Sequence, residues 1–338
     1  MDFTSDTVTI PSPEMLASMI TAKVGDNVYN NDPTVIHLQE LISLKTNKPA
    51  SLFVASCTMA NQLAILSLVS APCSILCNSS SHVFKYEGGG ASFLSRATLI
   101  PINAASTLTP LLISKHLITS NDIHCPQTQL IIIEIPLNGV VIPLQDVIDI
   151  HNIAKSKNIK MHLDGARLWN ASISTNIPIS EYCKYFDTIS LCFSKGLGCP
   201  LGAILSCTKQ VYNSALRFRK VLGGGWRQAG YLAQAAIYAL DNHYPKLVND
   251  HDNAKFVESE LIRLGFTVTR SVDTNMVWFD ATGLNVDELM AFLEKRGLVV
   301  SLNCDGDSRL VFHHQVDYNS CLVLIKGIQE FLLSESSV

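Results

Sequence analysis

The chain has 338 residues, of which 47% are apolar and 16% charged, and its formal net charge is −4. This composition is typical of a globular protein and excludes a disordered one, and the length permits two domains. The sequence has no basic run of five or more residues and no apolar stretch long enough to span a bilayer. We therefore expect neither nucleic acid nor a membrane as a partner.

The ten cysteines are scattered and include no CxxC pair, which argues against a zinc site. The N-terminus lacks the basic start and the apolar run of a secretion signal. We expect a cytoplasmic protein that holds no metal and whose thiols are reduced.

Residues 1–35 are rich in turn formers and poor in periodicity, which predicts an arm laid over the body of the protein. Strands and helices alternate through the next part of the chain, and we expect 36–250 to form a large domain. Its predicted strands are 129–135, 159–164, 187–193 and 201–207, with a helix at 143–158 between the first two. This order predicts the α/β class, with a mostly parallel, doubly wound sheet.

Further along, helices are predicted at 227–240 and 251–266 from their apolar periodicity. The apolar segments 275–281 and 286–298 follow. We expect residues 251–338 to form a small C-terminal α+β domain.

Two charged residues stand at the carboxyl ends of predicted strands, Asp164 after 159–164 and Lys195 after 187–193. Lys195 alone could be a surface lysine whose stem lies over apolar residues, and Asp164 could pair with Arg167 to hold a loop. In doubly wound sheets, however, the ligand cleft lies beyond this edge. Pyridoxal phosphate enzymes need both residue types, a lysine that condenses with the cofactor aldehyde and an acid that keeps the ring nitrogen protonated.

A phosphate group would also need a cradle, and two segments offer one. In 55–66, small residues and Thr58 precede a helical run, whose first N–H groups can hold an anion. In 222–230, three glycines precede Arg227, at the predicted start of a helix. Neither segment matches a P-loop or a dinucleotide fingerprint.

With these residues in place, the chain resembles the threonine aldolases, which are pyridoxal phosphate enzymes of the aspartate aminotransferase fold (fold type I). The resemblance covers nearly the whole length, and two of its motifs are closer to the fungal branch. The matching segments are 5–16, 24–35, 52–64, 82–91, 163–171, 190–205, 219–230, 273–277 and 308–317.

The resemblance implies a role for each matching residue. Lys195 carries the cofactor, Asp164 pairs with its ring nitrogen, and His82 stacks on the ring. Thr58 and the backbone of Cys57 hold the phosphate. The other implied site residues are Ser5, Arg167 and Arg309 for the substrate carboxylate (Arg167 also counting among the cofactor-binding residues), Arg227 for the phosphate of a neighbouring subunit's cofactor, His124 near the substrate hydroxyl and Tyr29 from the partner chain.

The implied reaction is cleavage of L-threonine or L-allo-threonine to glycine and acetaldehyde, with His82, His124 or a water as base, in a homodimer or homotetramer. Three departures from the family pattern leave the substrate open: Thr4 replaces arginine, Cys57 replaces glycine, and 134–136 reads Glu-Ile-Pro instead of Glu-Asn-Thr. A related alanine racemase of fungal peptide biosynthesis is the alternative, and a non-catalytic relative is a third possibility. The preferred epimer of threonine is not predicted.

Overall fold

The computed structural model describes residues 1–304 and 306–335. Its helices are α1 (Pro13–Ile20), α2 (Pro33–Thr46), α3 (Cys57–Leu68), α4 (His82–Lys85), α5 (Gly90–Ser95), α6 (Pro110–His116), α7 (Leu144–Ser156), α8 (Leu168–Thr175), α9 (Ile179–Cys183), α10 (Lys209–Val221), α11 (Gly230–Asn242), α12 (Leu247–Arg263), α13 (Val286–Glu294) and α14 (Tyr318–Glu335). Its strands are β1 (Ala50–Val54), β2 (Ser74–Asn78), β3 (Thr98–Ile102), β4 (Thr128–Glu134), β5 (Lys160–Gly165), β6 (Thr188–Cys192), β7 (Ala203–Cys207), β8 (Met276–Asp280) and β9 (Asp307–Val311).

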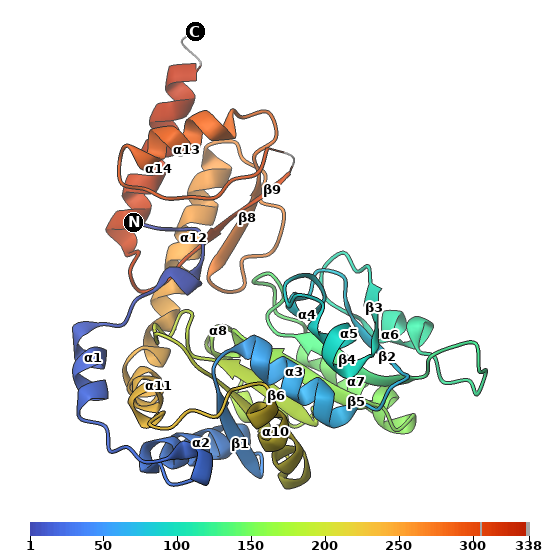
Figure 1. Cartoon of the computed structure of the whole chain (residues 1–338). Coiled ribbons are helices and arrows are strands. Elements are labelled where there is room, and N and C mark those ends of the chain that lie inside the picture. Colours follow the sequence, from blue (N-terminus) through green and yellow to red (C-terminus); the bar gives the residue numbers. More distant parts are fainter. Residues whose placement is uncertain (305, 336–338) are drawn as a thin grey trace.

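A seven-stranded sheet has the order β1-β7-β6-β5-β4-β2-β3 (Figure 1). The strands β3, β2, β4, β5 and β6 pair in parallel, and β7 lies antiparallel to both β1 and β6. The prediction of an α/β fold with a mostly parallel sheet is confirmed. The four strands predicted from sequence are β4, β5, β6 and β7, each within two residues of its predicted ends.

Helices cover both faces of this sheet, which is why its central strands are apolar along their whole length. On one face, side chains of α3 and α10 pack with those of β1 and β7. On the other face, α2, α7, α8 and α11 contribute to a larger core. The carboxyl ends of β4, β5 and β6 lie side by side at one end of the sheet.

The helix predicted from Arg227 begins three residues later, at Gly230, so this prediction is wrong in its start. The buried carboxylate of Asp32 explains the difference. It caps α2 through the N–H groups of Thr34 and Val35, and it also accepts the N–H of Gly230 at 2.9 Å. A Cβ at position 230 would lie 2.4 Å from a carboxylate oxygen of Asp32, so only glycine fits this shared cap.

A second core lies in the C-terminal part of the molecule, where α12, α13 and α14 pack against the antiparallel pair β8–β9 (Figure 1). Phe3, from the opposite end of the chain, is fully buried in it, with its ring centroid 5.7 Å from that of Phe312. The N–H of Phe3 donates to Val299 at 2.8 Å, and its carbonyl accepts from Val311 at 2.9 Å. The N-terminal segment therefore belongs to this core. Residues 336–338, the end of the predicted C-terminal domain, lie outside the described residues.

From this core the segment runs down one side of the molecule through α1 to α2 (Figure 1). The predicted arm is therefore partly regular, because Ser12 caps α1 by accepting the N–H of Met15, and Pro13 follows the cap. Met15 is fully buried in the core of the large sheet.

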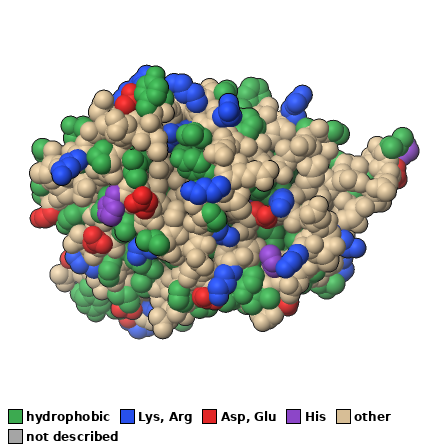
Figure 2. Space-filling view, turned by 90° about the horizontal axis from the view of Figure 1, so that it is seen from below, with side chains coloured by type: hydrophobic (Ala, Val, Ile, Leu, Met, Phe, Trp, Pro, Cys, Tyr) green, Lys and Arg blue, Asp and Glu red, His purple; other side chains and the backbone are tan. Residues whose placement is uncertain are grey.

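Acidic and basic side chains alternate with apolar ones on the face shown in Figure 2. A projection at the right of both views is formed by the segment between α6 and β4. Within the described residues, no helix combines the length and apolarity that crossing a bilayer requires.

We expect Phe3→Ala to lower the free energy of unfolding by about 3–5 kcal/mol, because it removes a fully buried aromatic ring and leaves a cavity. Urea denaturation followed by tryptophan fluorescence measures the effect. Phe93→Ala is the matched control, since Phe93 is 84% exposed, and it should change stability by less than about 0.5 kcal/mol. Equal effects of the two substitutions would contradict a docked N-terminal segment.

Candidate active site

Three chemically active residues meet where the parallel strands end. Glu134 closes β4 and is the register partner of Asp164 on β5. Lys195 follows the adjacent strand β6, and its carbonyl accepts a hydrogen bond from Thr9 at 2.9 Å. The predicted convergence of Asp164 and Lys195 at neighbouring strand ends is what the sheet shows.

Asp164 is a buried carboxylate, only 2% exposed. One oxygen accepts the N–H of Ala166 at 3.1 Å and the thiol of Cys57 at 3.8 Å, and the other accepts the amide of Asn61 at 2.7 Å. Among the described residues it forms no ion pair with a Lys or Arg side chain. The alternative of an Asp164–Arg167 pair is therefore wrong, because Arg167 pairs with another residue.

That residue is Asp6 in the N-terminal segment, which Arg167 binds through Nε at 2.8 Å and Nη2 at 2.5 Å. Burial alone would raise the pKa of Asp6, but the charge and hydrogen bonds of Arg167, with the charge of Lys195, lower it to about 2. Two residues earlier, the carbonyl of Thr4 accepts Nη2 of Arg309 at 3.0 Å. Ser5 lies between these contacts, so the segment brings the three predicted carboxylate-binding residues together.

The N-terminus of α3 faces the same region. Ser56 caps the helix by accepting the N–H of Met59, and no described residue accepts the N–H groups of Cys57 and Thr58. Cys57 does not have a positive φ, so the cysteine at this position has an ordinary backbone conformation. Two free N–H groups at the positive end of a helix of this length suit an anion.

His82 is held from two sides. Its backbone N–H donates to Glu134 at 2.8 Å, and Nδ1 lies 2.9 Å from Oε1 of Glu87. The hydrogen bond to Glu87 raises the pKa of His82 against the effect of partial burial. Burial and the nearby charge of Asp164 raise the pKa of Glu134 to about 7. With Nδ1 engaged, Nε2 of His82 remains as the nitrogen that can exchange a proton.

Three predicted site residues lie elsewhere in this chain. His124 is on the projecting segment between α6 and β4, and its 84% exposed side chain contacts Asp122. Arg227 pairs with Asp26 at 2.7 Å and lies over the ring of Tyr29, which is 77% exposed. The structure gives these residues no contact with Asp164 or Lys195 in the same chain.

Sequence reasoning missed four buried members of this region: Asp6, Asn61, Glu87 and His162. Two had a signal in their spacing. Asn61 follows Cys57 by one helical turn, and His162 precedes Asp164 by two strand positions, so each shares a face with a residue that was identified. Asp6 and Glu87 stand in loops or short turns, where no periodicity reports the direction of a side chain.

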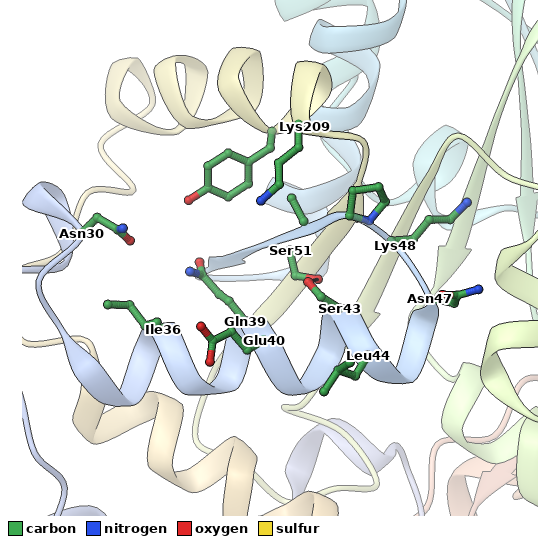
Figure 3. Close-up of a pocket in the computed structure, with 13 residues that line it drawn as sticks. Asn30, Ile36, Gln39, Glu40, Ser43, Leu44, Asn47, Lys48, Ser51 and Lys209 are labelled. Atoms are coloured by element: carbon green, nitrogen blue, oxygen red, sulfur yellow. Dashed lines mark hydrogen bonds between the residues drawn. The ribbon is translucent and has the colours of Figure 1, made fainter.

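A surface groove of about 830 Å³ lies away from these residues, between α2 and α10 over the free edge of β1 (Figure 3). Gln39 and Glu40 line it from α2, and Lys209 lines it from α10. Gln39 already uses its carbonyl to accept the N–H of Phe53 on this edge. No residue of the strand-end region lines the groove, so it is separate from the candidate active site.

The donor set at the strand ends fits pyridoxal phosphate. Asp164 is a buried acid without a cationic side-chain partner, as a protonated ring nitrogen requires. Within 1–304 and 306–335, no residue hydrogen-bonds the amine of Lys195. The unpaired N–H groups at the N-terminus of α3 suit a phosphate. Fold and site together define an α/β enzyme of the pyridoxal phosphate class.

The chain belongs to the beta-eliminating lyase family, whose model matches residues 2–283, and it is an enzyme of the lyase class. It is 38% identical to a probable low-specificity L-threonine aldolase of Schizosaccharomyces pombe, covering 96% of this chain and 85% of that protein. The low specificity L-threonine aldolase of Escherichia coli is 37% identical, with 94% of each chain covered. An alanine racemase of Cochliobolus carbonum, TOXG, is 34% identical over 99% of this chain and 88% of its own length.

Solved structures support the fold at lower sequence identity. The threonine aldolase of Leishmania major superposes with a TM-score of 0.84 at 19% identity, covering 98% of this chain and 99% of the other. A serine palmitoyltransferase solved with pyridoxal phosphate gives a TM-score of 0.76 at 14% identity, covering 98% of this chain and 86% of the other. Fold type I is therefore confirmed.

We expect Glu87→Gln to lower the pKa of His82, because a neutral amide replaces the carboxylate that holds the protonated imidazole while burial continues to oppose it. The pH titration of the His82 ring signals by NMR, assigned with His82→Asn, measures the shift. Glu181→Gln removes a surface carboxylate and serves as the control, which should leave the His82 titration unchanged. An unchanged titration in Glu87→Gln would contradict the His82–Glu87 contact.

Proposed function

We propose that this protein is a pyridoxal-phosphate-dependent aldolase that cleaves L-threonine and L-allo-threonine to glycine and acetaldehyde. The carrying observation is the buried, cation-free Asp164 beside Lys195 at the strand ends, in a chain similar to threonine aldolases over nearly its whole length. When bound, pyridoxal phosphate supplies the electron-accepting ring that the cleavage of an amino-acid Cα–Cβ bond requires.

The described contacts support a role for each residue on the protein side of the cofactor site. Lys195 provides the amine that holds the cofactor covalently, and its loop is fixed by Thr9. Asp164, oriented by its hydrogen bonds to Asn61 and Ala166, is the acid that would hold the proton on the ring nitrogen. Thr58 and the N–H of Cys57 bind the phosphate at the start of α3.

The substrate carboxylate is bound by Arg167, Arg309 and Ser5. Arg167 uses Nε and Nη2 for Asp6, which leaves Nη1 for the substrate, and Arg309 uses only Nη2 for Thr4. Two guanidinium groups fixed in this way orient the amino acid before reaction, so less entropy is lost in reaching the transition state.

His82 is the base that takes the proton of the β-hydroxyl group. Its Nδ1 is held by Glu87, as the orienting acid holds the histidine of a catalytic triad, and its Nε2 is free. His124 lies on an exposed projecting segment, so in this proposal it reaches only the site of another copy.

The assembly is a homodimer at least, or a homotetramer. Arg227 and Tyr29 are exposed on one surface and do not contact Asp164 or Lys195 of their own chain. In a closed symmetric assembly they complete the site of the partner, with Arg227 at its phosphate.

Alanine racemisation is the second candidate, favoured by the 34% identity to the racemase TOXG over 99% of this chain. It needs the same Lys195 and Asp164, but only a proton is exchanged at Cα and no carbon–carbon bond breaks. The products therefore separate the two reactions.

We expect the purified protein to be yellow, to lose its colour on borohydride reduction with the cofactor fixed to the Lys195 peptide, and to release acetaldehyde and glycine from threonine. Lys195→Ala should reduce turnover at least about 1,000-fold, because it removes the amine that holds the cofactor and on which the other site residues depend. Peptide mass spectrometry and a coupled acetaldehyde assay provide the measurements.

Lys209→Ala, in the surface groove, is the control and should keep full activity. Both alanine enantiomers are tested in parallel. Inversion of alanine, with no aldehyde released from threonine, would show that the protein is a racemase and not an aldolase. A protein that stays colourless with added pyridoxal phosphate would exclude both.

The shared site is tested by mixing inactive Lys195→Ala subunits with weakly active Arg227→Ala subunits under conditions that allow subunit exchange. If both residues serve one site from different chains, some hybrids hold one intact site, and activity should return to about one quarter of the wild-type level in random dimers. No recovery, with exchange proven by labelled subunits, would place Arg227 outside the partner's site.

A further inference from the structure

Asn61 lies at the centre of the buried polar network below the candidate cofactor site. It stands on the inner face of α3, and it is completely buried. Its Nδ2 donates to Asp164 at 2.7 Å and to Glu87 at 2.8 Å. Its Oδ1 accepts the hydroxyl of Ser190 at 2.7 Å and Nε2 of His162 at 2.9 Å.

These four contacts fix the orientation of the amide. The two carboxylates can only accept, so the nitrogen of Asn61 must face them and its oxygen must face the donors. His162 then carries its proton on Nε2, and Nδ1 accepts the hydroxyl of Thr188 at 2.8 Å. Burial lowers the pKa of His162 to about 4, so this ring is neutral and adds no charge to the network.

The amide separates two acids with different tasks. A ring nitrogen of His82 and one oxygen each of Glu87 and Asp164 all lie within 4.8 Å of one another. Two buried carboxylates this close both need hydrogen-bond donors, because burial removes the water that would otherwise solvate them. Asn61 gives each carboxylate one of its two N–H groups, while Gln62 donates only to Glu87, at 2.7 Å.

We propose that Asn61 is a positioning residue that joins Asp164 to the Glu87–His82 pair, so that one side chain positions both the acid that would pair with the cofactor ring nitrogen and the proposed base His82. The inference rests on the proposed function for the roles of Asp164 and His82. It adds Asn61 as the residue that couples the role of Asp164 to the role of His82.

The test compares Asn61→Ala with Gln62→Ala in protein loaded with pyridoxal phosphate. Gln62 is the matched control, because it is the next residue on α3, is also buried and supports Glu87 without touching Asp164. Cofactor affinity by equilibrium dialysis and the pH dependence of cofactor absorbance report on Asp164. The NMR titration of His82 reports on Glu87.

Asn61→Ala should weaken cofactor binding about 10-fold to 100-fold, since a buried carboxylate loses a donor, and should shift both the absorbance titration and the His82 titration. Gln62→Ala should shift only the His82 titration and leave cofactor affinity within about twofold. In the Asp164→Asn background, Asn61→Ala should lose most of its effect on cofactor affinity, because it acts through Asp164.

Additive effects of Asn61→Ala and Asp164→Asn, or equal effects of Asn61→Ala and Gln62→Ala on affinity, would overturn the inference. If Asn61→Ala does not fold, Asn61→Ser, which keeps a hydroxyl but cannot donate to both acids, carries the same expectations. A wild-type protein that binds no cofactor would refute the proposed function instead, and the two failures are thereby distinguished.

Discussion

The candidate site depends on a carboxylate, Asp164, that is buried without a cation of its own. Such a group is stable only if hydrogen bonds replace the lost water or if a bound ligand supplies the charge. The fold provides three donors, and in the proposed function a protonated ring nitrogen of the cofactor would supply the missing positive charge. The cofactor is therefore expected to contribute to stability as well as to chemistry, because it binds only the folded chain.

The N-terminal segment links the two cores through this same region. Phe3 is part of the core around β8 and β9, and Met15 belongs to the core of the large sheet. Between them, Asp6 neutralises the buried guanidinium of Arg167, and Thr4 holds Arg309. The positions of the two arginines relative to each other are thus set by a short stretch of chain that crosses from one core to the other.

Two departures from the family pattern, at Cys57 and after Glu134, are compatible with the site. Cysteine at position 57 starts α3 without a positive φ, so its N–H is still available to an anion. Its thiol is directed to Asp164 and adds a weak donor there. Ile135 and Pro136 replace the Asn-Thr pair of the family pattern, but Glu134 itself is retained. Its carboxylate accepts the N–H of His82.

The sequence by itself determined the four strands β4 to β7 and the helix α7, the mostly parallel class of the sheet, and the placement of Asp164 and Lys195 at strand ends, because periodicity and strand ends are local properties. It did not determine that Arg167 pairs with Asp6, that α11 starts at Gly230, or that Asn61 joins two acids. Those contacts join residues far apart in the chain. Only the packed structure decides them, since each buried polar group takes the partner that the fold brings within hydrogen-bonding distance.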